Sequence, residues 1–565
     1  MSALLEPFIH EPRIAYFSME IALESEIPTY SGGLGVLAGD TMRSAADLDL
    51  PMIGVTLASR AGYFRQEIVD GRQLERPDTW QPEKWARRLP AKVALQIGQR
   101  EVWVGAWLYS VEGHRGGAVP VILLDTDLPE NKAEDRELTH YLYGGDQTYR
   151  LKQEMVLGIG GVRMLGALGL EIRKYHLNEG HAALLTLELL RRLAHSLQEA
   201  GNPGLHYDVP AVRQRCVFTT HTPVEAGHDQ FPYELAERLL GDFIDGTQLR
   251  RLAGEDRLNM TRLALNLSEH VNGVARRHAE VSRRMFPGYR VHAITNGVHP
   301  WTWACDSFRR LYDAHLPRWC HEPELLVRAD RIPDEDLRKA HAEAKAALLE
   351  RVRGPGGQVL DPALPLLGFA RRMTPYKRAD LLFSDLERLK AIARRQPFQI
   401  VLAGKAHPRD GGGKELIERL HGWAKQLQGK VAVVYLPDYD MESARLIVSG
   451  VDVWLNLPLR PLEASGTSGM KAALNGVPNL SVPDGWWLEG WIEGITGWAV
   501  GGEADADNAR DAASLYDKLE HTVLPLYHGD RAGWAAVMKG AITRNASFFN
   551  SHRMMRRYAV EAYLR

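Results

Sequence analysis

The chain has 565 residues, of which 45% are hydrophobic and 25% charged, as in soluble globular proteins. Lys and Arg number 69 and Asp and Glu 71, and this net charge of −2 argues against a general nucleic-acid binder. The length predicts about two to four domains, and the composition excludes disordered and fibrous classes.

The three cysteines, Cys216, Cys305 and Cys320, are sparse and contain no CxxC motif. They fit a reducing compartment and argue against a disulfide scaffold or a cysteine zinc site. The N-terminal residues lack the basic start and apolar run of a signal peptide, and no apolar stretch approaches the ~18 residues of a membrane span. We therefore expect a cytoplasmic protein with no nucleic-acid partner, no membrane segment and no metal.

Strands and helices alternate in the first part of the chain. Arg13–Ser18 is a predicted strand, TYSGGLGVLAGD a glycine-rich loop, Asp40–Leu48 a helix and PMIGVTL a buried strand. Further predicted strands are VWVGAWLYS, VPVILLD, KYHLN and CVFTTH. This alternation predicts a parallel sheet covered on both faces.

The second part repeats this pattern more clearly. The predicted strands are LPLLGFA, FQIVLAGKA, VAVVYLP, VDVWLNLP and PNLSVPDG, with amphipathic helices between them. We therefore expect an α/β fold of two doubly wound, Rossmann-like domains with a ligand site between them. The turn residues of TNGVHP place the boundary near Asn296–Pro300. The predicted units are an N-terminal domain (1–298), a C-terminal domain (299–540) and a helical segment (541–565) that packs back on the first domain.

The most informative segment is EASGTSGMK, from Glu463 to Lys471, which follows a predicted strand and opens a helix. Small residues at a helix start leave backbone N–H groups free to bind phosphate. Lys471 lies one turn inside, beside apolar neighbours, where desolvation would lower its pKa and favour reaction with an aldehyde cofactor. The alternative is a helix cap followed by a solvent-facing lysine.

A second segment, Arg371–Arg378 (RRMTPYKR), places four cations directly after the strand LPLLGFA. The carboxyl end of a strand is where an α/β domain binds anions. The alternative is a solvated basic rim, although cations that follow a buried strand are less typical of one.

The remaining motifs are weaker. Ser31–Gly35 (SGGLG) can bring backbone amides to a phosphate, but its spacing is not a dinucleotide fingerprint. Gly411–Lys414 is not a P-loop, because Glu415 stands where Ser or Thr is needed. Three segments at strand ends offer polar side chains for hydroxyl groups, or simple caps and turns: Asn178–His181, Thr220–Pro223 and Thr295–Gly297.

Together these segments resemble the α-glucan (glycogen, starch and maltodextrin) phosphorylases. The matches occur in order as FSMEIA, YSGGLG, HLNEGHAALL, THT, VNGVARRHAEV, TNGVHPWTW, RRMTPYKR, GKAHP and EASGTSGMKAALNG. The pairing of EASGTSGMK with RRMTPYKR is the most restrictive. The resemblance implies a GT-B type fold, with the active-site cleft between its two domains.

The resemblance also implies roles for individual positions. Pyridoxal 5′-phosphate would be held by Lys471, Arg371, Gly466, Thr467, Trp303 and Tyr439. The catalytic group would be Lys471, Arg372, Lys377 and His221, with Arg372, Lys377 and the amides of Gly33 and Leu34 on the substrate phosphate. Glucose hydroxyls would be read by Glu463, Ser465, Gly466 and Asn296. The approach of donor and acceptor would be shaped by Glu20, Glu179 and His181.

The implied reaction is retaining phosphorolysis of α-1,4-glucan non-reducing ends to α-D-glucose 1-phosphate, with the cofactor's phosphate as acid and base. The partners would be glucan and inorganic phosphate. One alternative is a nucleotide-sugar α-glucosyltransferase of the same fold without pyridoxal phosphate, but Tyr30 and Ser31 precede the glycines where that family carries Lys. Another is an inactive glucan-binding protein, against which the intact Lys471, Arg372 and Lys377 argue.

Several positions depart from the family pattern. Ser468 and Gly469 change the usual GTGNMK, Ala22 replaces an expected aromatic residue, and Asp440 replaces an expected arginine. We expect a partly rebuilt cofactor pocket. Only 12 residues precede Arg13, and the segment before Arg150 is compact. These lengths predict that a regulatory tail and a dimer-contact helix are missing, that allosteric control is absent, and that a homodimer is in doubt.

Overall fold

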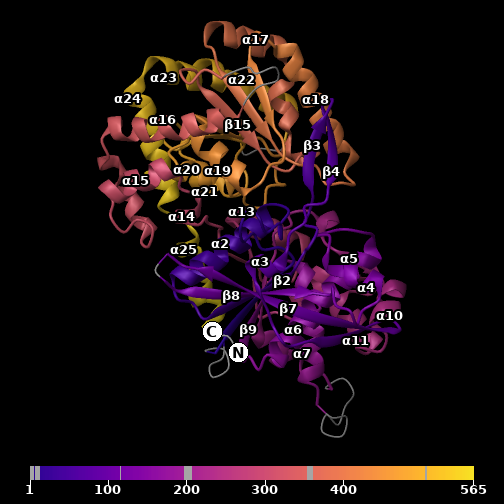
Figure 1. Ribbon diagram of the computed structural model, residues 1–565. Coiled ribbons are helices and arrows are strands. Elements are labelled where there is room, and N and C mark those ends of the chain that lie inside the picture. The colour runs from indigo at the N-terminus through magenta and orange to yellow at the C-terminus, as the bar shows by residue number, and fades with distance from the viewer. Residues whose placement is uncertain are drawn as a thin grey trace.

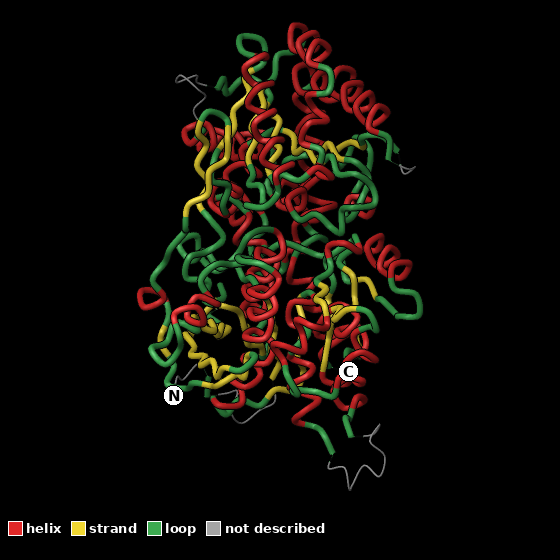
Figure 2. Tube along the Cα trace, turned by 90° about the vertical axis from the view of Figure 1, so that its right-hand side faces the viewer, coloured by secondary structure: helices red, strands yellow, loops and turns green. Residues whose placement is uncertain are grey.

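The structure is a computed structural model that describes residues 5–6, 13–114, 116–195, 206–352, 360–502 and 506–564. Most of the residues before Arg13, on which the predicted lack of a regulatory tail depends, lie outside these ranges. The described residues form two large sheets and two small two-stranded sheets, with helices around them. Figure 2 shows the strands in two groups, one in each half of the molecule.

The elements of the first half contain most of the sequence-predicted strands. The strands are β1 (Arg13–Ser18), β2 (Met52–Leu57), β3 (Arg65–Val69), β4 (Arg72–Arg76), β5 (Arg87–Arg88), β6 (Val93–Ile97), β7 (Arg100–Glu112), β8 (Ala118–Asp125), β9 (Ile172–Asn178), β10 (Cys216–Thr219), β11 (Gln230–Pro232), β12 (Arg257–Asn259), β13 (His270–Gly273) and β14 (His292–Ala293). The helices are α2 (Gly33–Asp47), α3 (Pro82–Trp85), α4 (Ala133–Arg136), α5 (Gln147–Met155), α6 (Gly161–Ala167), α7 (Leu185–Arg192), α9 (Val209–Arg215), α10 (Tyr233–Leu240), α11 (Gly246–Ala253), α12 (Met260–Asn266) and α13 (Arg276–Met285).

The second half follows after α14 (Pro300–Trp303). Its strands are β15 (Leu366–Ala370), β16 (Gln399–Ala403), β17 (Ala432–Leu436), β18 (Val453–Asn456), β19 (Asn479–Ser481) and β20 (Gly497–Ala499). Its helices are α15 (Asp306–His315), α16 (Asp334–Arg351), α17 (Leu386–Arg395), α18 (Gly411–Leu427), α19 (Met441–Gly450), α20 (Ser468–Leu474), α21 (Trp487–Gly490), α22 (Asn508–Lys518), α23 (Leu524–Gly529), α24 (Arg531–Gly540) and α25 (Ser551–Tyr558).

The ten-stranded sheet of the first half has the order β14-β13-β10-β9-β1-β2-β8-β7-β5, with β6 also paired to β7. The pairs from β14 to β8 are parallel, as predicted. The prediction is wrong for β7, which pairs antiparallel with β8, β5 and β6. The physical reason is the short connection at Gly113–Gly117, because a parallel neighbour needs a crossover of about a dozen residues or more.

The six-stranded sheet has the order β17-β16-β15-β18-β19-β20, and all its pairs are parallel. The sequence analysis predicted five of its strands but not β20. The predicted helix at Asp40–Leu48 begins earlier, at Gly33, so the glycine-rich segment forms the first turns of α2. Gly33 and Leu34 thereby lie at a helix N-terminus.

The central strands are buried on both faces, which explains their nearly continuous apolar sequence. On β1, Ala15 and Phe17 pack into one hydrophobic cluster, and Ile14 and Tyr16 pack into another on the opposite face. Successive strand side chains point to opposite faces, so a single strand supports two cores.

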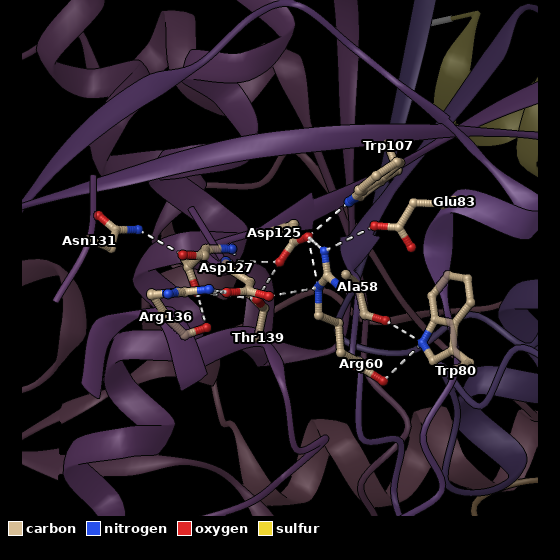
Figure 3. Close-up of polar contacts among 12 residues, drawn as sticks. Ala58, Arg60, Trp80, Glu83, Trp107, Asp125, Asp127, Asn131, Arg136 and Thr139 are labelled. Carbon is tan, nitrogen blue, oxygen red and sulfur yellow. Dashed lines mark hydrogen bonds and ion pairs between the residues drawn. The ribbon is translucent and has the colours of Figure 1, made fainter. Parts of the chain in front are cut away.

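A polar cluster at the end of β8 fixes the loops beside this sheet (Figure 3). Asp125 is only 2% exposed. Its Oδ2 accepts hydrogen bonds from Arg60 Nη2 at 2.7 Å and Trp107 Nε1 at 2.8 Å. Burial acts to raise the pKa of Asp125, but the hydrogen bonds and charge of Arg60 lower it overall. The buried carboxylate is therefore charged and paired at neutral pH.

A hairpin of the first half reaches the second half. Figure 1 shows β3 and β4 rising beside α18. Gln66 donates from its backbone N–H to Asp438 Oδ1 at 2.8 Å and from Nε2 to the Gly404 carbonyl at 2.9 Å. Gln73 Nε2 donates to the Ala406 carbonyl at 2.9 Å. These buried amides join the two halves at this edge.

The C-terminal helix α25 returns to the first sheet (Figure 1). Asn272 Nδ2 donates to the hydroxyl of Tyr558 at 2.9 Å. His299 Nε2 and His552 Nε2 lie 2.9 and 3.1 Å from Asp47 Oδ2. The two imidazoles contact the same carboxylate oxygen, and these contacts join α2, the start of α14 and α25.

Candidate active site

Lys471 lies in the first turn of α20 and is 6% exposed, as the sequence analysis predicted for a buried amine. Its Nζ is 3.6 Å from the ring centroid of Trp303. Burial lowers the pKa of Lys471 to about 8, against a smaller opposing effect of Asp40. The lower pKa increases the fraction of neutral, nucleophilic amine near physiological pH.

Asp40 fixes the position of the Trp303 ring that contacts Lys471. The Nε1 of Trp303 donates to its two carboxylate oxygens at 3.0 and 2.8 Å. Asp40 belongs to α2 of the first half, whereas Lys471 belongs to the second. The sequence analysis missed Asp40; its place in the glycine-rich segment YSGGLGVLAGD was the available signal.

Two of the predicted phosphate-binding cations lie on one carboxylate. Arg371 Nη2 and Lys377 Nζ are 2.9 and 2.8 Å from Glu463 Oε2. Burial acts to raise the pKa of Glu463, but the charges of Arg371 and Lys377 lower it overall. Arg371 also bonds Asn456. The structure thus brings three predicted residues together, with Glu463 as the counterion of the cations.

The fourth cation of this segment, Arg378, does not face the pair. It is 4% exposed, and its Nη2 lies 2.7 Å from Asp511 Oδ2. It also donates to the carbonyl groups of Leu457 and Pro458. Arg378 therefore anchors the loop after β18.

Arg372 extends toward the start of α2. A Cβ built on Gly32 would lie 3.5 Å from Arg372 Nη2. Gly33 and Leu34 are the first residues of that helix, where N–H groups have no acceptor within the helix. Arg372, from the second half, therefore lies close to Gly32, the residue that precedes the predicted amides of the first half.

Glu20 lies against the glycine-rich turn that precedes α2. Its carboxylate accepts the backbone N–H of Ser31 at 2.6 Å and of Gly32 at 3.2 Å. It also accepts the hydroxyl of Tyr143 at 2.8 Å. Its contacts in the structure are thus to the glycine-rich turn.

Glu179 and His221 lie together at the ends of β9 and β10. Glu179 Oε2 accepts the backbone N–H of His221 at 2.7 Å, and the His221 Nε2 lies 2.6 Å from Asn178 Oδ1. Burial lowers the pKa of His221 to about 3. The imidazole is therefore neutral at pH 7.

His181 lies next to a charged group that the sequence analysis missed. Its Nε2 is 3.5 Å from Asp229 Oδ2, which also lies 2.8 Å from Arg150 Nη2. Burial and the charge of Arg150 lower the pKa of His181 to about 3. The sequence analysis named Arg150 only as the end of a compact segment and did not predict this contact.

Three predicted ligand-binding atoms are buried without a hydrogen-bond partner among the described residues: Asn296 Oδ1, Ser465 Oγ and Arg371 Nε. Leaving a buried polar atom unpaired costs about 1–3 kcal/mol. These atoms suit a polar ligand that supplies the missing partners. Their chemistry, one guanidinium donor with a hydroxyl and an amide oxygen, fits a ligand that carries phosphate or hydroxyl groups.

Other positions explain the departures from the family pattern. Asp440 caps α19 through Ser443, whose N–H it accepts at 2.8 Å. A Cβ on Gly469 would lie 2.3 Å from Asn479 Oδ1, so this position requires glycine. Tyr439 lies close enough to Arg371 for that charge to oppose the burial-induced rise in its pKa. Thr467 precedes α20, and its carbonyl accepts the N–H of Lys471 at 3.1 Å.

Asp484 was also missed. Its Oδ2 accepts the backbone N–H of Glu463 at 2.9 Å, and its Oδ1 accepts that of Gly485. Burial raises the pKa of Asp484 to about 6. Its place after a predicted strand, in PNLSVPDG, was the signal available in the sequence.

Fold and site together define an α/β protein with a buried amine on Trp303 and a pair of cations on Glu463. A sequence profile of the carbohydrate phosphorylase family matches residues 18–102 and 244–490. The maltodextrin phosphorylase of Thermococcus litoralis is 40% identical, over 98% of this chain and 70% of that protein. Glycogen phosphorylases of Mycobacterium tuberculosis and Aquifex aeolicus are 38% and 36% identical, each over 97% of this chain and over 70% and 86% of their own lengths.

The chain belongs to the carbohydrate phosphorylase family, and the predicted resemblance is confirmed. It is a phosphorylase-type enzyme of mixed α/β architecture, and the strands of its two large sheets are mainly parallel. None of the described helices combines the length and apolar character of a membrane span.

Proposed function

We propose that the chain is an α-1,4-glucan phosphorylase that binds pyridoxal 5′-phosphate at Lys471. Family membership and relatives named maltodextrin and glycogen phosphorylase support the activity. The observation that carries the cofactor assignment is the buried Lys471 amine on Trp303, with its pKa lowered to about 8. The substrates would be a glucan and inorganic phosphate.

We further propose a GT-B arrangement, with units 1–298, 299–540 and 541–565 and the active-site cleft between the first two. Two separate large sheets, one entirely parallel and one mainly parallel, support it. So do contacts across the halves, since Tyr30 OH accepts the Met441 N–H at 3.0 Å and Arg372 extends to Gly32.

The cations of the site would bind two different phosphate groups. Pyridoxal phosphate, when bound, supplies a phosphate whose second pKa of about 6 allows proton exchange at neutral pH. Arg371 would hold that phosphate with Gly466 and Thr467, while Arg372, Lys377 and the start of α2 would hold the substrate phosphate. Two neighbouring anions repel each other strongly, and this cluster would offset that repulsion.

The sugar would be oriented by polar atoms that lack partners or carry fixed charges. Asn296 and Ser465 would bond hydroxyl groups, and Glu463 would accept from the sugar while it keeps Arg371 and Lys377 in place. His221, neutral at pH 7, would contribute its backbone carbonyl near developing positive charge. Glu179 positions this segment through the His221 N–H.

The direct test is borohydride reduction of the purified protein followed by peptide mass mapping. A pyridoxyl group should be found on Lys471, and Lys471→Ala and Lys471→Arg should lack it. Both should also lose formation of glucose 1-phosphate from maltodextrin and phosphate. The exposed Lys425→Ala on α18 is the matched control and should retain both signals. No adduct, together with turnover of a nucleotide sugar, would instead support the glucosyltransferase alternative.

A further inference from the structure

A cavity outside the candidate active site is lined in part by Trp303, the residue on which Lys471 lies. Its volume is about 530 Å³, and residues of both halves line it. Trp303 is the one residue that it shares with the predicted cofactor and substrate positions. The cavity is therefore separate from the cluster around Glu463.

Three arginines from three helices line this cavity: Arg43 of α2, Arg309 of α15 and Arg445 of α19. All three are partly buried. Arg309 is held in place, because its Nε and Nη2 donate to the Trp301 carbonyl at 3.0 and 2.7 Å and its guanidinium lies 4.5 Å from the Trp301 ring centroid. Its position is thus fixed before any ligand arrives.

Arg309 and Arg445 are close enough to repel each other. Burial and the charge of Arg445 lower the pKa of Arg309. The guanidinium of Arg445 forms no hydrogen bond or ion pair with any residue of the described ranges. Two like charges held together in a partly buried site are unfavourable unless an anion is added.

The acidic residues at the cavity do not supply that anion. Glu24, Glu112 and Glu442 also line it, but all three are exposed. Glu24 accepts the Tyr109 hydroxyl at 2.8 Å, and Glu112 accepts the Ser110 hydroxyl. Within the part of the chain that is described, none of these three pairs with Arg309 or Arg445. Arg309 Nη1 pairs instead with the exposed Asp306 Oδ1 at 3.1 Å, so Arg445 is the guanidinium that has no counterion among the described residues. The carboxylates thus lie at the rim, and the guanidinium groups are less exposed.

We propose that this cavity is a second anion site that binds a phosphate group, either as inorganic phosphate or on a small phosphate monoester. A tetrahedral phosphate offers acceptor oxygens in several directions, which suits guanidinium groups arriving from three helices better than a planar carboxylate does. Because Arg43 belongs to the first half and Arg445 to the second, the ligand would join the two. Trp303, which forms part of the wall of this cavity, also contacts Lys471.

The test measures phosphate binding to the purified full chain by titration calorimetry, with Arg372→Ala and Arg445→Gln alone and combined. Arg372→Ala should remove the proposed substrate site and keep a second binding event. Arg445→Gln should weaken that second event at least tenfold, as expected for the loss of a charge-assisted contact. The double variant should lose both events, and exposed Arg394→Gln on α17 should match the wild type.

Two further measurements sharpen the test. Repeating the titration with glycerol 3-phosphate separates the ligand sources, since binding of inorganic phosphate alone identifies a free-ion site and binding of both identifies a monoester site. Arg445→Gln should not lower the melting temperature, because it removes an uncompensated charge. Loss of all phosphate binding in Arg372→Ala, or a lower melting temperature in Arg445→Gln, would overturn the proposal. The site and its test are independent of the assignment of Lys471.

Discussion

Replacing Glu463 with Gln should show how much this carboxylate stabilises the fold by neutralising Arg371 and Lys377. In the structure one carboxylate, 5% exposed, lies 2.9 Å from Arg371 Nη2 and 2.8 Å from Lys377 Nζ. At an effective dielectric of 20 each contact has a gross attraction of about 6 kcal/mol, an upper bound that desolvation largely offsets. Measured losses for removing one partner of a buried pair are about 3–5 kcal/mol. Because Gln keeps one acceptor, we expect Glu463→Gln to lower the free energy of unfolding by about 3 kcal/mol.

The assay is urea denaturation followed by tryptophan fluorescence, with and without phosphate. Phosphate should stabilise Glu463→Gln more than the wild type, because Arg371 and Lys377 lose their internal counterion and can bind the ligand more tightly. Glu418→Gln is the control. Its ion pair with Arg72 is exposed (47% and 71% for the two side chains) and should contribute no more than about 1 kcal/mol.

The pH dependence of stability tests independently whether folding lowers the pKa of Glu463. The pKa of Glu463 is lower in the folded protein than in the unfolded chain. Its stabilisation is therefore present above the unfolded pKa and is lost as pH falls through the folded pKa. The difference between wild type and Glu463→Gln should be constant from pH 6 to 8 and shrink in acid. A loss no larger than that of the control, or equal phosphate stabilisation of both proteins, would refute the reasoning.

Three further predictions concern stability. The pKa of Asp484 is raised from 3.8 to about 6, so the stability that its carboxyl group contributes falls as pH rises between these values. In denaturant titrations the free energy of unfolding of the wild type, relative to that of Asp484→Asn, should fall by about 3 kcal/mol from pH 3.5 to 7. A difference that does not depend on pH would contradict the shift. Gly485 has φ +54°, and a Cβ added there would lie 2.4 Å from the Ser465 carbonyl oxygen. Gly485→Ala should therefore lower the free energy of unfolding by at least about 1–3 kcal/mol. Gly411 faces open space, so the control Gly411→Ala should change the free energy of unfolding little. Asp125→Asn breaks a buried ion pair and should cost about 3–5 kcal/mol by urea denaturation; a loss under about 1 kcal/mol would show that the pair is solvated.

Much of the local structure could be predicted from the sequence. The pattern RIAYFS predicted β1 at its observed bounds, and the predicted strands LPLLGFA and VAVVYLP contain β15 and β17. EASGTSGMK placed Lys471 on a helix start with apolar neighbours, and the structure buries it there. These features depend on side chains a few positions apart, whose periodicity and turn chemistry are visible in one sequence.

Partners distant in the chain could not be predicted in this way. Trp303 meets Asp40 across 263 positions, and Glu463 meets Arg371 across 92. Such contacts depend on the order of strands in each sheet and on how the two halves join. The segment RRMTPYKR showed four cations, but only the tertiary structure separates Arg378, which anchors a loop, from Arg371 and Lys377 on Glu463.

The sequence by itself determined the strand–helix alternation, the helix start that carries Lys471 and the order of motifs that identifies the family. The tertiary structure decided that β7 runs antiparallel, that Glu463 neutralises two predicted phosphate ligands, and that Arg43, Arg309 and Arg445 line one cavity. The physical reason is range. Propensity, capping and periodicity act between neighbours in the chain, whereas charge pairing and burial depend on which distant segments the folded sheets bring together.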